Sequence, residues 1–175
     1  IAGLNVLDIL NEPTAAALAY GFKDYLDAGG DVGNVGGAVK ATDTLRNVVV
    51  YDLGGGTFDV TVIRIEGEQF RVLAKEGEGC LGGTDWDKRI LSHAVERFQA
   101  EHGDDPRQDP HSHQELLLAV EEAKRDLSLR DSTVFTVHCG GHRSVVEITR
   151  GQFEDMTSAL LYRTESRVCQ VIENA

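Results

Sequence analysis

Residues 48–65 read VVVYDLGGGTFDVTVIRI, so three consecutive glycines stand between two runs rich in β-branched residues. Such runs favour β-strands, and a tight turn between two strands needs about one glycine with a positive φ. Three glycines in a row allow the backbone to pass close to a bulky anion with its N–H groups pointing inward. The pattern therefore favours a phosphate loop at Gly54, Gly55 and Gly56, with an ordinary glycine-rich turn as the alternative.

Two carboxylates and a hydroxyl stand at the rim of the same loop, at Asp52, Asp59 and Thr57. Carboxylates repel a bare phosphate, but Mg²⁺ prefers one or two carboxylates together with water and phosphate oxygens. These residue types therefore predict a phosphate group that is bound together with Mg²⁺.

The composition is that of a soluble globular protein, with 41% hydrophobic and 26% charged residues in a chain of 175. This length suffices for one domain with a real core. The net charge of −12 disfavours nucleic acids and anionic membranes as partners, because both attract clustered Lys and Arg. An anionic nucleotide stays compatible with that charge, because Mg²⁺ and backbone N–H groups supply local positive potential.

The chain has no apolar run near the ~20 residues that span a bilayer and no basic, then apolar leader, which predicts a cytoplasmic protein with no membrane partner. Three scattered cysteines, Cys80, Cys139 and Cys169, favour reduced and mostly buried thiols over a disulfide framework. The first residue is Ile1, for which processing and a cut from a longer protein are both explanations.

Periodicity and turn residues predict an α/β order of elements with consecutive, meander-like strands. Residues 4–10 are expected to form a short strand or a buried segment. Strands are expected at 47–53, 58–65 and 69–77, followed later by a hairpin of two strands about residues 140–142. The expected helices run from Pro13 to Gly21, over 84–102, around 116–127 and over 151–173. Apolar residues recur at helical spacing in the second of these helices, at Trp86, Ile90, Ala94 (with Val95) and Phe98, and in the third, at Leu116, Val120, Ala123 and Leu127. A glycine-rich loop without any Walker-type motif is expected at 23–46.

Burial and capping are predicted for several of these elements. The strand at 47–53 is expected to be buried on both faces, because its apolar run is continuous. Pro13 is expected in the first turn of its helix and Gly21 at the end, with Thr84 as the N-cap of the next helix. The last helix is expected to turn six residues toward the core: Phe153, Met156, Leu160, Leu161, Val168 and Ile172.

Glu12 precedes Pro13 at the expected start of a helix, where the helix dipole stabilises a carboxylate. Capping alone explains such a residue. If that helix faces the glycine loop, Glu12 can instead hold a water molecule that is bound to a metal ion. The sequence leaves both explanations open.

Glu121, Lys124, Arg125 and Ser128 fall on one face of an expected helix, at i, i+3, i+4 and i+7. A solvated face with a Glu–Lys pair is the common explanation, and the pattern alone favours it. The alternative is a nucleoside site in which Glu and Lys bind ribose hydroxyls, Arg stacks on the base and Ser meets the base edge. Elsewhere in the sequence neither a catalytic triad nor a four-ligand zinc pattern is readable.

Four stretches follow one another in order: NEPTAAALAYG (11–21), DLGGGTFDV (52–60), LGGTDWD (81–87) and EEAKRDLS (121–128). Together they closely resemble the nucleotide-binding domain of the seventy-kilodalton heat-shock chaperone family (heat shock protein 70 family), within the actin-like ATPase superfamily. The resemblance covers nearly the whole chain apart from residues 23–46. It implies an α/β fold: an actin-like ATPase (ribonuclease-H-like) lobe with a mixed sheet and packed helices, plus a smaller α+β subdomain.

The resemblance also implies a division of the chain into five segments. These are a strand with the interlobe connecting helix (1–22), a glycine-rich loop insertion (23–46), the phosphate-loop strands of the second lobe (47–83), a smaller subdomain with the nucleoside-contacting helix (84–150) and a C-terminal helix of the fragment (151–175).

Each matching residue receives a role from the resemblance. The β- and γ-phosphates of ATP or ADP are expected to be bound, largely through backbone N–H groups, by Gly54, Gly55, Gly56 and Thr57. Mg²⁺ is expected to be held through water by Asp52, Asp59 and Glu12, and the catalytic set is Asp52, Thr57 and Glu12. The ribose and the base are expected at Glu121, Lys124, Arg125 and Ser128. Gly82 and Gly83 are expected to shape the loop near the nucleotide.

The function that the resemblance implies is that of an ATP-hydrolysing molecular chaperone, acting in protein folding and the stress response. In this family the nucleotide state controls the binding of unfolded or extended peptide clients, and co-chaperones and nucleotide-exchange factors are further partners. The alternative is a nucleotide-binding regulator or exchange-factor-like relative without productive hydrolysis.

Several parts of the family pattern are missing from the sequence. They are the first phosphate loop, the lysine that meets the γ-phosphate, the C-terminal glycine pair of the adenosine pocket and the peptide-binding domain. The chain is therefore expected to be a fragment of a nucleotide-binding domain, with an incomplete site and little ATPase activity by itself. Thr84 and Trp86 are further departures, because the family usually has an acidic residue and Phe at these positions.

Overall fold

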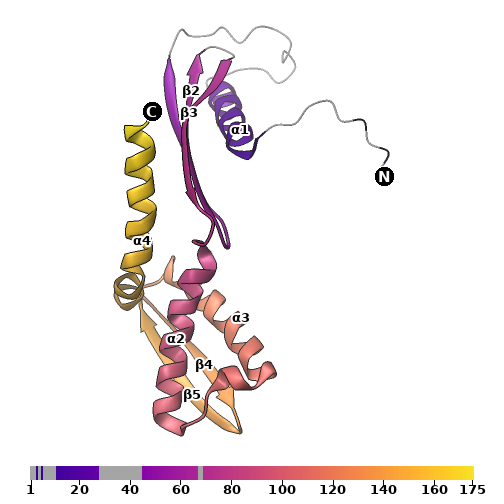
Figure 1. Cartoon of the computed structure of the whole chain (residues 1–175). Helices are drawn as coiled ribbons and strands as arrows, with labels where there is room; N and C mark the ends of the chain where they lie inside the picture. Colours follow the sequence, from indigo (N-terminus) through magenta and orange to yellow (C-terminus); the bar gives the residue numbers. More distant parts are fainter. Residues whose placement is uncertain (1–2, 4, 6–10, 28–44, 67–68) are drawn as a thin grey trace. The chain divides into compact units, whose positions relative to one another are not determined.

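The computed structural model describes residues 3, 5, 11–27, 45–66 and 69–175, and for residues 21–27 it describes the backbone alone. The expected strand at 4–10, apart from residue 5, and residues 28–44 of the expected loop lie outside the described residues. The described elements form a mixed α/β chain (Figure 1). In order they are α1 (Glu12–Asp27), β1 (Arg46–Leu53), β2 (Phe58–Glu66), β3 (Gln69–Glu78), α2 (Gly83–His102), η2 (Pro106–Gln108), α3 (Pro110–Leu127), β4 (Ser132–Cys139), β5 (His142–Thr149) and α4 (Arg150–Glu173).

The chain divides into two compact units. The first unit is formed by Ile1–Asp52, Asp59–Gly77 and Arg167–Ala175, and the second by Leu53–Phe58 and Glu78–Ser166. The glycine loop, α2, α3 and the β4–β5 hairpin therefore belong to the second unit.

A three-stranded sheet with the order β1–β2–β3 lies in the first unit, as the sequence predicts. β2 is the central strand, and its Val60 and Ile63 side chains are fully buried. The prediction that the strand at 47–53 is buried on both faces is wrong, because Val49 and Tyr51 of β1 remain 45% and 46% exposed. A β-branched run predicts a strand, but the neighbours of the strand determine its burial, and β1 lies at an edge of the described sheet.

α1 has Pro13 in its first turn, as predicted. The predicted end at Gly21 is wrong, because the helix continues to Asp27 and includes residues 23–27 of the expected loop. A glycine inside a helix costs only about 1 kcal/mol relative to alanine, so helix-forming neighbours can continue the helix through it.

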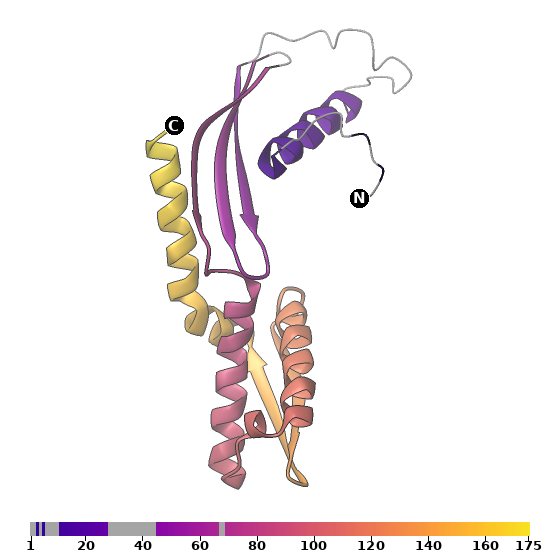
Figure 2. The ribbon, with the colours of Figure 1, turned by 45° about the vertical axis from the view of Figure 1, so that its right-hand side comes forward.

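The main hydrophobic core of the second unit lies between α2, α3 and the β4–β5 hairpin (Figure 1, Figure 2). The predicted helical spacing of the apolar residues in both helices is confirmed for most of them, because they form one buried cluster, whereas Trp86 is half-buried and lies outside that cluster. The cluster contains Ile90, Ala94, Val95 and Phe98 of α2, Leu116, Val120 and Leu127 of α3, and Val137, Val146 and Ile148 of the hairpin.

The predicted hairpin about residues 140–142 is also confirmed. β4 and β5 are antiparallel and in register from Ser132 opposite Thr149 to Cys139 opposite His142. The turn between them is Gly140–Gly141, and both glycines have a positive φ, 59° and 82°. Two successive residues with positive φ are what a type I′ hairpin turn requires.

α4 occupies the predicted range, but two of its predicted core residues are exposed. Leu161 is 61% exposed and Ile172 is 54% exposed. The residues of α4 that the structure buries follow a helical stripe of their own: Thr157, Leu160, Thr164 and Val171. An apolar side chain is buried only where it falls on the stripe of the helix that faces a neighbouring element. Thr157 and Thr164 fall on that stripe, and Leu161 and Ile172 do not.

The three cysteines carry free thiols, as predicted, but Cys80 and Cys169 are exposed, so the expectation of mostly buried thiols is wrong. Within the described part of the chain, none of the helices combines the length and the apolar character that a membrane span requires.

Candidate functional site

The glycine loop between β1 and β2 is a tight turn in the second unit. The Gly54 N–H donates a hydrogen bond to the Thr57 carbonyl oxygen at 2.9 Å, and this bond closes the turn. Gly55, Gly56 and Thr57 are exposed. The four residues that the sequence predicts as a phosphate loop thus form one continuous and mostly exposed turn, hereafter the triglycine loop (Gly54–Thr57).

Carbonyl oxygens of the triglycine loop accept hydrogen bonds from the first turn of α2. The Gly83 N–H donates to the Gly54 carbonyl at 2.8 Å, and the Thr84 N–H donates to the Gly55 carbonyl at 2.9 Å. The Thr84 hydroxyl donates to the same Gly55 carbonyl at 2.8 Å. The first N–H groups of any helix lack partners within the helix, so the loop satisfies donors that α2 leaves open.

Thr84 is therefore not the N-cap that the sequence predicts. The N-cap of α2 is Gly82, whose N–H donates to the Asp85 carboxylate at 3.0 Å. Lys88 donates to the same carboxyl group at 2.9 Å. The hydrogen bond from Lys88 is the main cause that lowers the pKa of Asp85 below its ordinary value. Burial opposes it, and the hydrogen bond from the Gly82 N–H adds a smaller lowering effect.

The contact with α2 also fixes the direction of the N–H groups in the triglycine loop. In a trans peptide unit the C=O and the N–H point in opposite directions. Because the Gly54 and Gly55 carbonyls point toward α2, the Gly55 and Gly56 N–H groups point away from it. Neither N–H has a backbone acceptor among the described residues. Two adjacent, exposed N–H donors without a partner are the basis of an anion-binding nest.

Nothing within the described chain requires glycine at positions 55 and 56. Neither has a φ in the left-handed region. A Cβ added at either position would meet no atom within 4 Å. The space where a side chain of Gly55 or Gly56 would stand is therefore open, and a bound group can approach the backbone there.

Gly82 differs, because close packing requires glycine there. A Cβ at Gly82 would lie 2.4 Å from the Gly56 nitrogen and 2.5 Å from the Gly55 carbonyl oxygen. Its φ of −169° is ordinary extended backbone, so the requirement is steric. The expectation that Gly82 and Gly83 shape the loop agrees with these contacts, since Gly83 donates directly to it.

Lys124 is the residue of the predicted nucleoside face that the structure brings to the base of the triglycine loop. Its Nζ donates to the Gly83 carbonyl oxygen at 3.1 Å and lies 2.8 Å from Asp87 Oδ1. The Gly83 N–H in turn donates to Gly54. The last turn of α3 is thus connected to the loop through the first turn of α2.

The other residues of this face make contacts along α3 itself. Arg125 forms an ion pair with Glu121 one turn earlier, and its side chain is 73% exposed. Ser128 is the exposed C-cap of α3, and its N–H donates to the Arg125 carbonyl at 3.1 Å. The Glu–Lys pair that was expected for a solvated face does not occur here, because Glu121 pairs with Arg125 and Lys124 pairs with Asp87.

The three predicted metal-site carboxylates belong to the first unit. Asp52 is exposed near the end of β1, and Glu12 is the exposed first residue of α1. Asp59, in β2, forms an ion pair with Lys75 at 3.1 Å. Among the described residues, no three His, Cys, Asp or Glu side chains gather in a way that could hold a metal ion.

Two residues near the site were not predicted from the sequence. Asp87 pairs with Lys124, and its only signal is its place in the LGGTDWD stretch, one helical turn after Gly83. Arg163 of α4 forms an ion pair with Glu78 and donates to the Cys80 carbonyl at 3.3 Å, which holds the segment that leads into α2. No sequence signal links Arg163 to that segment.

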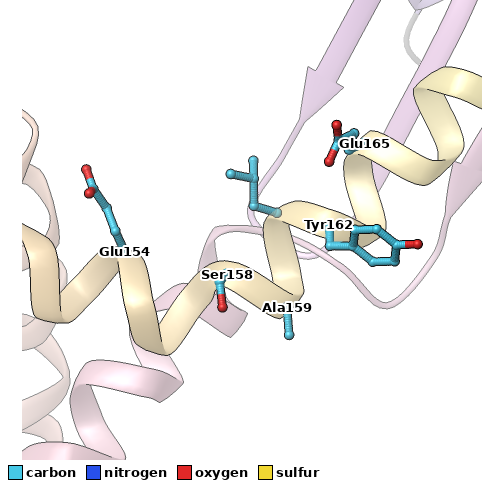
Figure 3. A pocket seen from close by; sticks show the side chains of 6 residues that line it. Glu154, Ser158, Ala159, Tyr162 and Glu165 are labelled. Carbon is cyan, nitrogen blue, oxygen red and sulfur yellow. The ribbon is translucent and has the colours of Figure 1, made fainter.

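α4 carries a surface hollow (Figure 3). It is lined by Glu154, Ser158, Ala159, Leu161, Tyr162 and Glu165. None of the predicted site residues lines it, so the hollow gives no information on the triglycine loop.

Comparison with known proteins gives consistent matches over the whole chain. A family model described as Hsp70 protein matches residues 1–175. The chain is 40% identical over 181 residues to the chaperone protein DnaK of Anaplasma marginale, an alignment that covers 100% of this chain and 25% of that protein. It is 39% identical to the chaperone protein DnaK of Halobacterium salinarum, with 100% of this chain and 26% of that protein covered. The chain thus spans about a quarter of the length of these relatives.

Proposed function

Since the chain belongs to the Hsp70 family, we propose that it forms part of an ATP-binding and ATP-hydrolysing domain of a molecular chaperone, with an actin-like ATPase (ribonuclease-H-like) fold. The observation that carries the proposal is the triglycine loop. Its Gly54 and Gly55 carbonyls are bound to α2, its Gly55 and Gly56 N–H groups are directed away from α2, and a Cβ at Gly55 or Gly56 would meet nothing within 4 Å.

In this proposal the β- and γ-phosphates bind at the exposed side of the triglycine loop. The Gly55 and Gly56 N–H groups donate to phosphate oxygens, and Thr57 adds its backbone N–H and its hydroxyl at the rim. α2 holds the loop in the required shape through the Gly54 and Gly55 carbonyls, so the donors are arranged before the nucleotide arrives. Such preorganised donors stabilise a phosphoryl group because they need no rearrangement when charge develops.

Mg²⁺ enters the proposal as an ion that arrives with the nucleotide. Asp52 and Asp59 stand on either side of the loop in the sequence, and both are carboxylates that retain contact with solvent. Mg²⁺ usually keeps several waters and binds one or two carboxylates plus substrate phosphates, which fits this donor set. Asp52, Asp59 and Glu12 would hold the ion through water, and the ion would supply positive charge beside the phosphates.

The nucleoside would bind along α3. Glu121 and Lys124 are proposed to bind the ribose hydroxyls, Arg125 to stack its guanidinium on the base, and Ser128 to contact the base edge. The exposed Arg125 side chain, oriented by its pair with Glu121, presents a planar cation that suits an aromatic base.

Hydrolysis would transfer the γ-phosphoryl group to water, with Asp52 orienting the attacking water and Thr57 and Glu12 completing the catalytic set. In the complete chaperone, this step would couple the nucleotide state to the binding of unfolded peptide clients. Co-chaperones and nucleotide-exchange factors are proposed as its other partners, and the cytoplasm as its location.

The test is a calorimetric titration of the complete gene product with ATP, with and without Mg²⁺, together with single-turnover hydrolysis. We expect Mg²⁺-dependent binding and hydrolysis that Asp52→Asn strongly reduces. The same titration on residues 1–175 alone is expected to show weak binding and no turnover above its Asp52→Asn control. Tight binding of ATP by the complete protein without any hydrolysis would favour a nucleotide-binding regulator instead.

A further inference from the structure

The Lys124 ammonium lies where α3 meets the first turn of α2. It is 3.1 Å from the Gly83 carbonyl oxygen and 2.8 Å from Asp87 Oδ1, and both acceptors belong to α2. Gly83 also donates its N–H to Gly54 at 2.8 Å. A continuous chain of contacts therefore joins Asp87, Lys124, Gly83 and the triglycine loop within the second unit.

The donors of Lys124 can be counted. An ammonium group has three N–H donors and no acceptor. One of them is directed to the Gly83 carbonyl, and the ammonium is paired with the Asp87 carboxylate at 2.8 Å without an aligned hydrogen bond. The Lys124 side chain keeps 24% of its surface exposed, so a free donor remains available to a ligand at the surface of α3.

The Asp87 carboxylate is largely withdrawn from water. Its side chain is 17% exposed, and its Oδ1 atom is enclosed. The Lys124 contact is an ion pair without hydrogen-bond alignment, and among the described residues Oδ1 has no hydrogen-bond donor. A carboxylate withdrawn from water requires a counter-charge, so Asp87 and Lys124 depend on each other.

We propose that Asp87 is a positioning residue for the nucleoside: it holds the Lys124 ammonium against α2 so that a free donor meets a ribose hydroxyl. This inference rests on the proposed function and adds to it a residue that acts through Lys124 without touching the ligand. With Asp87 neutralised, the ammonium keeps only the Gly83 carbonyl and is free to move into solvent, and the ribose contact is lost.

The experiment compares ADP with 2′,3′-dideoxy-ADP, which lacks both ribose hydroxyls, by calorimetry on the complete gene product. The wild-type protein should bind ADP about 100-fold more tightly than the dideoxy analogue, as two hydrogen bonds to charged groups suggest. Asp87→Asn should weaken ADP about tenfold and leave the affinity for the dideoxy analogue within about twofold of wild type. This selective loss is not expected from a change that merely loosens the packing of α2.

A double-mutant cycle with Lys124→Met supplies a second readout. Because Asp87 acts through Lys124, the double variant Asp87→Asn/Lys124→Met should bind ADP no more weakly than Lys124→Met alone. Additive losses in this cycle would overturn the proposal. If Asp87→Asn does not fold, Asp87→Glu keeps the charge and moves it by one methylene, and it should show the same selective loss for ADP.

Asp105→Asn is the matched control, since Asp105 also pairs with a cation, Arg107, in the same unit. It should leave the ratio of the two affinities unchanged. Equal weakening of ADP and the dideoxy analogue by Asp87→Asn would show that Asp87 only supports the fold, and would overturn the inference. A wild-type protein that binds neither nucleotide would instead contradict the proposed function itself.

Discussion

Two glycine-rich turns of the second unit use glycine for different reasons. In the β4–β5 hairpin, Gly140 and Gly141 have φ values of 59° and 82°, which side chains rarely tolerate. In the triglycine loop, Gly55 and Gly56 have no positive φ, and a Cβ at either would meet nothing within 4 Å. Backbone conformation explains the first turn completely, and it explains nothing about the second.

The difference separates a glycine that the fold requires from one that a ligand requires. A hairpin glycine should cost stability when it is replaced and leave binding unchanged. A loop glycine should leave stability unchanged and weaken the binding of phosphate. Gly82 is a third case, because packing against the triglycine loop requires it and replacement should affect both properties.

The largest loss of stability is expected for Gly82→Ala. Its new Cβ would lie 2.4 Å from backbone at Gly56, which cannot move aside as a flexible side chain can. We expect a loss of about 3 kcal/mol in the free energy of unfolding, measured by urea denaturation. Gly79→Ala, whose Cβ would meet nothing within 4 Å, is the control, and equal stability of the two variants would contradict the packing argument.

Gly141→Ala is expected to have the next largest effect. The position has open space for a Cβ but a φ of 82°, so the cost is that of the left-handed conformation, about 1–2 kcal/mol. Urea denaturation measures the loss, and nucleotide titration should show no change in affinity. Gly141→Asn should recover part of the stability, because Asn tolerates this conformation better than Ala does.

A smaller and pH-dependent effect is expected at the N-terminus of α2. The pKa of Asp85 is lowered by its hydrogen bonds with Lys88 and the Gly82 N–H, so the folded state favours the ionised form. Its contribution to stability is present above the unfolded-state pKa near 4 and is lost as the pH falls through the lower folded-state pKa. Urea denaturation of wild type and Asp85→Asn at pH 7 and at pH values below about 4 should show a difference that shrinks with acid, and a constant difference over this range would contradict this role.

The smallest effect on stability is expected for Gly55→Ala. Its Cβ points into open space, so the free energy of unfolding should change by less than about 0.5 kcal/mol. In the complete gene product the same variant should weaken ATP binding at least about tenfold, because the methyl group occupies space proposed for the phosphates. Unchanged ATP affinity would place the phosphates elsewhere and remove the main support for the proposed function.

Local signals predicted most of the described elements. The β-branched runs predicted β1 and β2, the spacing of Ile90, Ala94 and Phe98 predicted α2, and the paired glycines predicted the turn at 140–141. Each of these signals depends on backbone preference or on periodicity within one element. The errors lie where a neighbouring element decides, as for the exposed Val49 and for the continuation of α1 beyond Gly21.

The candidate site shows the same division. Sequence motifs identified the triglycine loop and the face of α3 as separate candidates, and pattern alone favoured a solvated face for the second. Only the fold brings Lys124 to the carbonyl of Gly83, and the fold also reveals Asp87 as its partner. Glu12, Asp52 and Asp59 stay predictions, because no contact in the described chain tests their roles.

By itself, the sequence determined most of the described strands and helices and the place of the glycine-rich turn between β1 and β2, because these properties follow from local conformational preference. The tertiary structure decided which glycines the fold needs and which way the loop directs its N–H groups. It did so because α2 binds the Gly54 and Gly55 carbonyls and thereby turns the opposite side of each peptide outward. A hydrogen bond between segments that are distant in the chain has no local signal, so no pattern in either segment could have predicted it.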